Sequence, residues 1–185
     1  YKNGSYSAFS NFFRFTLLYK KGGYWIDADL LCVKPFTFTQ DVVISGEPDK
    51  GYNKTNPTSF MIKLPKGSDI AKEGVRIQRE HKILILSGEM EWGSGPATIK
   101  ILVDKFDIDV LHWHITCSCY YDDFFSLTDS TFKEWNDSKA IVKVEEIPED
   151  MICIHLWNEK WRRSKHSKEK IYDKNSLYEY FNSKH

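Results

Sequence analysis

Apolar side chains recur at most positions around the helical wheel of residues 6–20. This pattern predicts a helix that is buried over most of its circumference. One stripe of the helix is polar, and its members at helical spacing are Ser7, Ser10, Asn11 and Arg14. A buried arginine needs a partner. The sequence leaves two alternatives open for Arg14, a structural salt bridge and a contact with an anionic ligand.

Shorter apolar runs predict strands, because they are rich in β-branched and aromatic residues. The expected strands span residues 24–26, 42–45, 58–64, 110–115, 140–144 and 151–155, and residues 27–35 are expected to form a further strand and its exit. Helices are expected at residues 68–81, 97–105, 132–135 and 176–182. Residues 46–57 carry turn-forming side chains and are expected to form a polar loop near the active site. Strands interspersed with helices indicate an α/β fold.

The stretch 22–29 combines a Gly-Gly turn, a short apolar strand and two aspartates. Asp27 and Asp29 are spaced i, i+2, which places both side chains on one face of an extended backbone. Neighbouring carboxylates repel each other unless a cation lies beside them, and such oxygen ligands suit Mg²⁺ or Mn²⁺. A solvated turn is the simpler alternative, and it is the interpretation that we give to Asp107 and Asp109.

Histidines occur in two of the predicted strands. His112 and His114 share one face of the run 110–115, but no third metal ligand is evident nearby, so we interpret them as a paired polar face. His155 ends the run 151–155 and precedes a tryptophan-rich segment. A histidine at a strand end is more often structural than metal-binding, and the residues around His155 alone do not decide between the two.

Composition narrows the class of protein. The 185 residues fit one domain with a sizeable core. They include 26 basic and 26 acidic side chains, and this balance argues against a dedicated nucleic-acid-binding protein. The cysteines show neither zinc-site spacing nor the density of a disulfide scaffold, which predicts reduced thiols in a cytoplasmic protein. They are Cys32, Cys117, Cys119 and Cys153. No apolar run is long enough to predict a transmembrane helix.

Residues 9–29 resemble the signature of the DxD sugar transferases of glycosyltransferase family 32, whose relatives include the α-1,4-glycosyltransferases. The family pattern runs Ser-Asp, two apolar residues, Arg, an apolar helix, Gly-Gly and x-Tyr-x-Asp-x-Asp. A match of this length is far more specific than Asp-x-Asp alone. Two residues depart from the pattern, because Asn11 replaces the usual Asp and Trp25 replaces the usual Tyr. The segment His-x-Trp-Asn at 155–158 is also similar to the end of such catalytic domains.

The resemblance implies a GT-A-type fold, a Rossmann-like mixed sheet flanked by helices that binds a nucleotide-sugar. The chain would form a single catalytic domain over residues 1–185, with a basic tail and a terminal helix at 162–185. It would correspond to the C-terminal part of such a domain and lack the first strands of the fold. The strand that ends at His155 would lie beside the strand of the DxD.

The resemblance also assigns roles to residues. The expected metal ligands are Asp27, Asp29 and His155, with Mn²⁺ or Mg²⁺ as the ion. The expected catalytic residues are Asp27, Asp29 and Arg14. The expected donor contacts are Ser10, Asn11, Arg14, Trp25, Asp27 and Trp157. Gly95 and Pro96 would lie on the acceptor side, whereas Glu89 and Glu91 have no assigned role.

The expected activity is metal-dependent transfer of a sugar from a nucleotide diphosphate donor, a UDP-sugar, to a carbohydrate acceptor. Retention of the anomeric configuration and a role in polysaccharide or glycoconjugate synthesis follow from the resemblance. The alternative is an inactive relative that binds a sugar or nucleotide as a scaffold, which the departures at Asn11 and Trp25 motivate. A phosphoesterase would need a second cluster of metal ligands that the sequence does not show. A cytoplasmic protein is expected, and its basic tail could touch an anionic membrane surface.

Overall fold

The computed structural model describes residues 6–87, 94–134, 138–164 and 166–184. Contacts divide the chain into two compact units. Unit 1 comprises Tyr1–Asp27, Phe38–Ser45 and Pro57–Val110. Unit 2 comprises Ala28–Thr37, Gly46–Asn56 and Leu111–His185. Helices and strands occur in both units, which confirms the expected α/β class.

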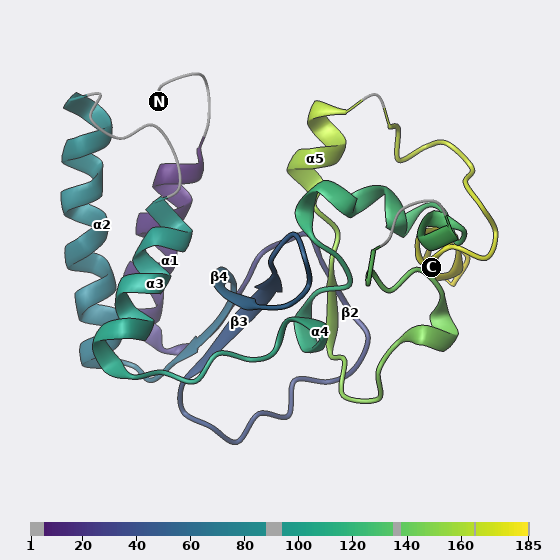
Figure 1. The fold of residues 1–185 in the computed structure, drawn as a ribbon. Coiled ribbons are helices and arrows are strands. Elements are labelled where there is room, and N and C mark those ends of the chain that lie inside the picture. The colour runs from purple at the N-terminus through teal and green to yellow at the C-terminus, as the bar shows by residue number, and fades with distance from the viewer. Residues whose placement is uncertain (1–5, 88–93, 135–137, 165, 185) are drawn as a thin grey trace. The chain divides into compact units, whose positions relative to one another are not determined.

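Unit 1 contains a group of helices and a three-stranded sheet within the described residues. The helices α1 (Ser7–Lys21), α2 (Asp69–Ser87) and α3 (Ser94–Phe106) lie side by side (Figure 1). The strand order is β1 (Gly23–Ile26), β4 (Thr55–Leu64) and β3 (Val43–Pro48). The core of this unit is apolar and includes Phe15, Leu18, Ile44, Ile62, Ile77 and Ile99, all almost fully buried.

Helix α1 ends at the Gly-Gly turn that the sequence predicts. The N–H of Gly22 donates to the carbonyl of Leu18 at 2.7 Å, and Gly22 has a φ of 68°, which glycine adopts without a Cβ penalty. The chain then enters β1, which pairs antiparallel with β4 so that Ile26 lies opposite Met61. The turn thereby brings α1 next to β1.

The prediction that α1 is buried over most of its circumference is wrong. Phe15 and Leu18 are buried, whereas Phe9 and Phe13 are 51% and 44% exposed. Helices α2 and α3 pack against α1, and the buried residues of α1 include the polar residue Arg14. The helix is therefore half-buried, with a mixed apolar and polar inner face.

Two helices of unit 1 are longer than the sequence pattern predicts. Ser68 caps α2 as expected, but the helix also takes in the apolar run 83–86. Helix α3 begins at Ser94, so that Gly95 and Pro96 lie in its first turn. Proline is tolerated there because an N–H in the first turn has no partner within the helix.

Unit 2 contains a two-stranded antiparallel sheet. Strands β2 (Leu30–Cys32) and β5 (Cys153–His155) pair so that Leu30 lies opposite His155 and Cys32 lies opposite Cys153. This pairing confirms that the strand ending at His155 lies beside the chain that leaves the DxD. The helices among the described residues of this unit are α4 (Trp113–Thr116), α5 (Asn158–Arg163) and α6 (Leu177–Asn182). Short 3₁₀ helices span Tyr121–Leu127, Phe132–Glu134 and Val144–Glu146.

Two predicted strands do not form. Within the run 110–115, Val110 makes only an isolated bridge to Ile44, and the following residues form α4. In the run 140–144, Ile141 is buried without joining a strand, and its N–H donates to a loop carbonyl. Strand-forming residues are those whose side chains pack well on a half-buried sheet. An apolar run that is buried against other parts of the core therefore need not pair as a strand.

The polar loop expected at 46–57 is shorter than predicted. Strand β3 extends to Pro48 and β4 begins at Thr55. Asp49 closes the turn between them, because its carboxylate accepts from the N–H of Asn53 at 2.8 Å. The helix expected at 132–135 is the 3₁₀ helix Phe132–Glu134, and its last expected residue lies outside the described residues.

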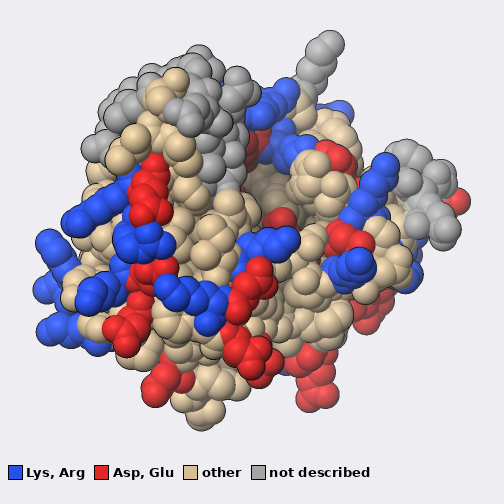
Figure 2. All heavy atoms as spheres, turned by 60° about the vertical axis from the view of Figure 1, so that its left-hand side comes forward, with Lys and Arg blue, Asp and Glu red and all other residues tan. Residues whose placement is uncertain are grey.

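Charged side chains of both signs alternate over the face of unit 1 that carries α2 (Figure 2). Glu73 of α2 accepts hydrogen bonds from Arg76 at 2.8 and 2.9 Å. It also accepts one from Lys105 of α3 at 2.8 Å. This three-residue contact ties α2 to α3 at the surface, where each pair contributes little to stability by itself.

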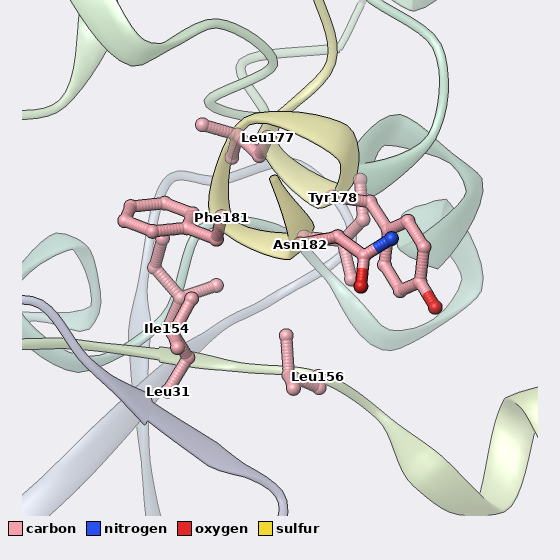
Figure 3. A pocket seen from close by; sticks show the side chains of 8 residues that line it. Leu31, Ile154, Leu156, Leu177, Tyr178, Phe181 and Asn182 are labelled. Carbon is pink, nitrogen blue, oxygen red and sulfur yellow. The ribbon is translucent and has the colours of Figure 1, made fainter. Parts of the chain in front are cut away.

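An apolar cavity of about 180 Å³ lies beneath α6 in unit 2 (Figure 3). Its lining comprises Leu31, Leu127, Ile154, Leu156, Leu177, Tyr178, Phe181 and Asn182. Leu31 and Ile154 are opposite each other in the β2–β5 ladder and both face the cavity. Because side chains alternate along a strand, Cys153 and His155 face the other side of the ladder.

The C-terminal segment, residues 158–182, belongs to unit 2. Its side chains Trp161 and Leu177 are almost fully buried there. Basic side chains of this segment pair with an acidic neighbour, since Arg162 and Arg163 both contact Glu159. Contact of the basic tail with a membrane surface stays a prediction. Within the described ranges, no helix has the length and apolar character needed to cross a membrane.

Candidate functional site

Arg14 and Asp27 meet in unit 1. Arg14 Nη2 lies 3.3 Å from Asp27 Oδ1, and Arg14 Nη1 donates to the carbonyl of Ser59. Trp25 donates its indole N–H to the same oxygen of Asp27 at 2.6 Å. The guanidinium carbon of Arg14 also lies 5.1 Å from the centre of the Trp25 ring, within the range of a cation–π contact. We call these four residues the Asp27 cluster.

The local sequence explains how the Asp27 cluster forms. The Gly-Gly turn returns the chain alongside α1, so Arg14 on the covered side of the helix meets Trp25 on β1. Strand β4 pairs with β1 and supplies the backbone of Ser59 and Phe60. The N–H of Asp27 donates to the carbonyl of Phe60 at 2.7 Å, which fixes the backbone of the first aspartate at the end of the sheet.

Burial makes the ion pair of the Asp27 cluster necessary. Arg14 is 5% exposed, and the side chain of Asp27 is 27% exposed. Burial lowers the pKa of Arg14, while the neighbouring Asp27 carboxylate raises it. A guanidinium stays protonated in proteins, so Arg14 requires the anion beside it. Of the two alternatives left by the sequence, the structure shows the salt bridge, and contact of Arg14 with a donor stays a prediction.

Helix α3 approaches the Asp27 cluster closely at Gly95. A Cβ on Gly95 would lie 2.8 Å from Asn11 Oδ1 and 3.0 Å from Ser59 Oγ, closer than such atoms normally approach. A larger residue at this position would therefore have to displace the side chain of Asn11 or Ser59, or shift the helix. Asn11 is buried and Ser10 half-buried on α1, whereas Pro96 is exposed. The predicted donor residues of α1 and the predicted acceptor-side Gly95 are thus neighbours within unit 1.

Asp29 and His155 meet in unit 2. His155 Nε2 lies 3.5 Å from Asp29 Oδ1, and the N–H of Asn158 donates to Asp29 Oδ2 at 2.9 Å. The carbonyl of Asp29 accepts from the N–H of Leu156, also at 2.9 Å. Burial raises the pKa of Asp29, but His155 and Asn158 outweigh this effect and hold the pKa at about 2. Asp29 is therefore an anion at neutral pH. We call Asp29, His155 and Asn158 the Asp29 cluster.

Trp157 adopts a backbone conformation that is rare for a bulky residue. Its φ of 53° and ψ of 45° are left-handed. The centre of its ring lies 4.2 Å from that of His155, at an interplanar angle of 76°. The turn at Trp157 starts α5, whose first residue Asn158 donates its N–H to Asp29. Strained backbone persists where the surroundings impose it, and it is frequent at functional sites.

The segment from Asp27 to Asp29 is not the extended strand that the sequence predicts. Ala28 and Asp29 lie in a turn, between the end of β1 and the start of β2. The backbone N–H of Asp27 donates to Phe60 of β4, whereas the carbonyl of Asp29 accepts from Leu156, the residue after β5. Asp27 and Asp29 therefore do not lie on one face of an extended strand, as the sequence had predicted. Each carboxylate is stabilised by donors of its own unit.

The structure brings the predicted metal ligands together in part. Asp29 and His155 are neighbours, whereas the carboxylate of Asp27 contacts Arg14 and Trp25. Across the described ranges, no three His, Cys, Asp or Glu side chains are grouped closely enough to hold a metal ion. The set of three ligands therefore stays a prediction.

Several groups that build these clusters could not be recognised in the sequence. The carbonyl of Ser59 and the N–H of Asn158 are backbone groups, which carry no side-chain signal.

Away from the two clusters, the carboxylate of Asp150 lies 2.9 Å from His114 Nε2, a contact that the sequence did not indicate. The rings of His112 and His114 are 4.4 Å apart, so the two histidines are indeed neighbours although no strand forms there. Glu89 and Glu91 lie outside the described residues.

Part of the chain matches a known protein family. Residues 2–49 match the model of the glycosyltransferase sugar-binding region containing DXD motif. This region includes α1, β1 and both aspartates of the DxD. The search of curated proteins found no match.

The match supports a glycosyltransferase with a DxD motif, although it covers only a minor part of the chain. Such regions generally bind a divalent metal ion and a nucleotide-sugar. It does not distinguish family 32 from other DxD transferases. His155 and Trp157 lie beyond the matched residues, so their connection to the motif rests on the structure.

Proposed function

We propose that the chain is a metal-dependent glycosyltransferase of the family 32 type that moves a sugar from a UDP-sugar to a carbohydrate acceptor. The observation that carries the proposal is the fixed geometry of the DxD aspartates. Asp27 is held by Arg14 and Trp25, and Asp29 is held by His155 and a backbone N–H. Both lie in the region that matches a DXD glycosyltransferase family.

Asp27, Asp29 and His155 would hold the Mn²⁺ or Mg²⁺ ion. A carboxylate ligand must be ionised, which the pKa of Asp29 at about 2 satisfies. The ligand atoms of Asp29 and His155 are 3.5 Å apart, and two metal–ligand bonds of about 2.1 Å can span such a separation. Asp27 is two residues from Asp29, so the covalent chain keeps their Cα atoms within about 7 Å.

A divalent ion supplies Lewis-acid stabilisation of the negative charge that develops on a departing diphosphate. The residues of this chain would prepare the site for it. Arg14 and Trp25 orient Asp27, and the N–H of Asn158 orients Asp29. Arg14 would also add positive charge near the diphosphate. Groups that are fixed before the reaction stabilise developing charge without the cost of reorganisation.

Donor and acceptor would be bound by residues around these clusters. Ser10, Asn11 and Trp25 would contact the nucleotide-sugar from α1 and β1, and Trp157 would contact it from the start of α5. Gly95 and Pro96 would lie on the acceptor side. Retention of the anomeric configuration is part of the proposal because the resembling family retains it.

The experiment that tests this function measures release of UDP from a panel of UDP-sugars by the purified chain. Many transferases hydrolyse their donor slowly when no acceptor is present, so the measurement does not require knowledge of the acceptor. We expect release that depends on Mn²⁺ and falls at least about tenfold in Asp29→Asn. Asp109→Asn makes the same change in the other Asp-x-Asp and should release UDP like the unaltered chain.

Two other outcomes are informative. Metal-dependent binding of UDP without release from any UDP-sugar would contradict the enzyme and favour the alternative of an inactive nucleotide-binding scaffold. Release that is equal in Asp29→Asn and in the unaltered chain would show that the chemistry occurs elsewhere, and it would overturn the proposed site.

A further inference from the structure

Two cysteines face each other across the β2–β5 ladder of unit 2. Cys32 lies directly opposite Cys153, and both are free thiols in the structure. The next pair but one along the ladder is Leu30 with His155, so the cysteine pair is a near neighbour of the Asp29 cluster. Neither cysteine has a role in the proposed function.

The hydrogen bonds of the ladder show which kind of pair the cysteines form. The N–H of Val33 donates to the carbonyl of Ile152 at 2.8 Å, and the N–H of Leu156 donates to the carbonyl of Asp29 at 2.9 Å. In an antiparallel ladder, hydrogen-bonded and non-hydrogen-bonded pairs alternate. Because Cys32 precedes Val33 by one position, Cys32 and Cys153 form a non-hydrogen-bonded pair.

This kind of pair has the geometry that a disulfide needs. Directly opposite residues at a non-hydrogen-bonded position have Cα atoms about 4.5 Å apart and side chains on the same face. Disulfides join Cα atoms that are roughly 4.4–6.8 Å apart. The cysteine pair therefore lies near the short end of the accepted range, where a bond can form but remains comparatively easy to reduce.

The two thiols also differ in access in the way that disulfide exchange requires. Cys32 is exposed, whereas Cys153 is fully buried and its thiol contacts the carbonyl of Thr116 at 3.7 Å. An external reagent can reach Cys32 first. Cys153 is shielded from an external reagent and faces Cys32 across the ladder, so it can react with a sulfur that is already bound there.

We propose that Cys32 and Cys153 form a reversible disulfide that staples β2 to β5 beside the Asp29 cluster. The oxidant is a small-molecule disulfide such as oxidised glutathione. The Cys32 thiolate attacks one sulfur of the reagent and displaces the first glutathione thiolate. The Cys153 thiol then passes its proton to the first glutathione thiolate, and its sulfur attacks Cys32 Sγ, forms the protein S–S bond and displaces the second glutathione thiolate, which takes up the proton that Cys32 released. Two protein thiols are oxidised and one glutathione disulfide is reduced to two thiols.

The bond would fix the register of the strands that carry the Asp29 cluster. Cys153 is on the same strand face as His155, two residues away, and Cys32 is three residues after Asp29. Oxidation would hold the β2–β5 pairing, and with it the approach of His155 to Asp29, under conditions that otherwise open so short a ladder. Formation of the bond itself does not depend on the proposed glycosyltransferase activity.

The test uses the full reduced chain incubated with oxidised glutathione, followed by digestion and mass spectrometry without reductant. We expect a peptide that joins Cys32 to Cys153 and that disappears after treatment with dithiothreitol. The thermal midpoint of the oxidised chain should exceed that of the reduced chain by roughly 5–10 °C. Cys32→Ser changes an exposed side chain, so it should fold normally and show neither the linked peptide nor the thermal shift.

Three results would overturn the inference. The first is a stable mixed disulfide of glutathione at Cys32 with Cys153 still reduced. The second is a linked peptide that joins Cys153 to Cys117, the other buried thiol next to Thr116. The third is a Cys32–Cys153 peptide without a rise of the thermal midpoint, which would mean that the bond forms only in opened molecules.

Discussion

Trp25 donates its indole N–H to Asp27 Oδ1 at 2.6 Å, so the residue that departs from the family pattern holds the first carboxylate of the DxD. Arg14 reaches the same oxygen and lies over the same ring. The three side chains therefore form one connected group. Trp25 supplies Asp27 with a hydrogen-bond donor from β1 and presents an aromatic face to Arg14.

Trp25→Phe should separate these two contributions. Phenylalanine keeps a ring beside Arg14 but removes the N–H, and a hydrogen bond to a partly exposed carboxylate contributes about 1 kcal/mol. We expect the free energy of unfolding to fall by about that amount, and the affinity for UDP in the presence of Mn²⁺ to fall roughly fivefold. Chemical denaturation and calorimetry measure the two effects. Tyr24→Phe, on the opposite face of β1, is the matched control and should leave the affinity for UDP unchanged.

Arg14→Leu should cost stability because it removes the cation beside Asp27. Deleting one member of a buried ion pair costs about 3–5 kcal/mol, and the partial exposure of Asp27 reduces the expected loss to about 2–3 kcal/mol. The double variant Arg14→Leu with Asp27→Asn should recover part of that loss, since no charge is then left without its partner. Additive losses in the double variant would show that the pair is not coupled.

The sequence predicted the elements that depend on local signals. The Gly-Gly turn after α1, the cap of α2 at Ser68 and the terminal helix near 176–182 follow from residue types at fixed positions. The pairing of His155 with the chain after the DxD also agrees with the family resemblance. In these cases the local preference and the tertiary contacts favour the same structure.

The sequence could not predict which apolar runs would find a partner. The run 110–115 has the composition of a strand, but Trp113 is buried in the core of unit 2 as part of a short helix. The turn at Ala28 was also not predicted. The residues on either side of it form backbone hydrogen bonds with distant parts of the chain, Asp27 with Phe60 and Asp29 with Leu156. The carbonyl of Ser59, which accepts from Arg14, and the N–H of Asn158, which donates to Asp29, are backbone groups whose positions depend on the completed fold.

Gly95→Ala should test the close approach of α3 to α1. The new Cβ would lie 2.8 Å from Asn11 Oδ1, and relief of such a contact requires the helix or the side chain to move. We expect a loss of about 1–2 kcal/mol in the free energy of unfolding, because overpacking outweighs the better helix propensity of alanine. Adding Asn11→Ala should reduce the loss. Pro96→Ala, at the exposed next position, should have little effect on unfolding.

Glu73 should make a small contribution to acid sensitivity. Hydrogen bonds from Arg76 and then Lys105 lower the pKa of Glu73 to about 2. A carboxylate with a lowered pKa stabilises the fold above its unfolded value near 4.5, and the contribution is lost as the pH falls from there towards 2. Both basic side chains are about half exposed, so screening limits the effect to about 1 kcal/mol. Glu73→Gln should be less stable at pH 7 and approach the unaltered chain near pH 2.

In the proposed function, the DxD and His155 hold a divalent ion together with a nucleotide diphosphate. Calorimetric titration of UDP into the chain with and without Mn²⁺ tests it, alongside the variants Asp29→Asn and Asp109→Asn. We expect binding that requires Mn²⁺, is weakened at least about tenfold by Asp29→Asn and is unaffected by Asp109→Asn. Equal affinity of the unaltered chain and of folded Asp29→Asn for UDP in the presence of Mn²⁺ would contradict it.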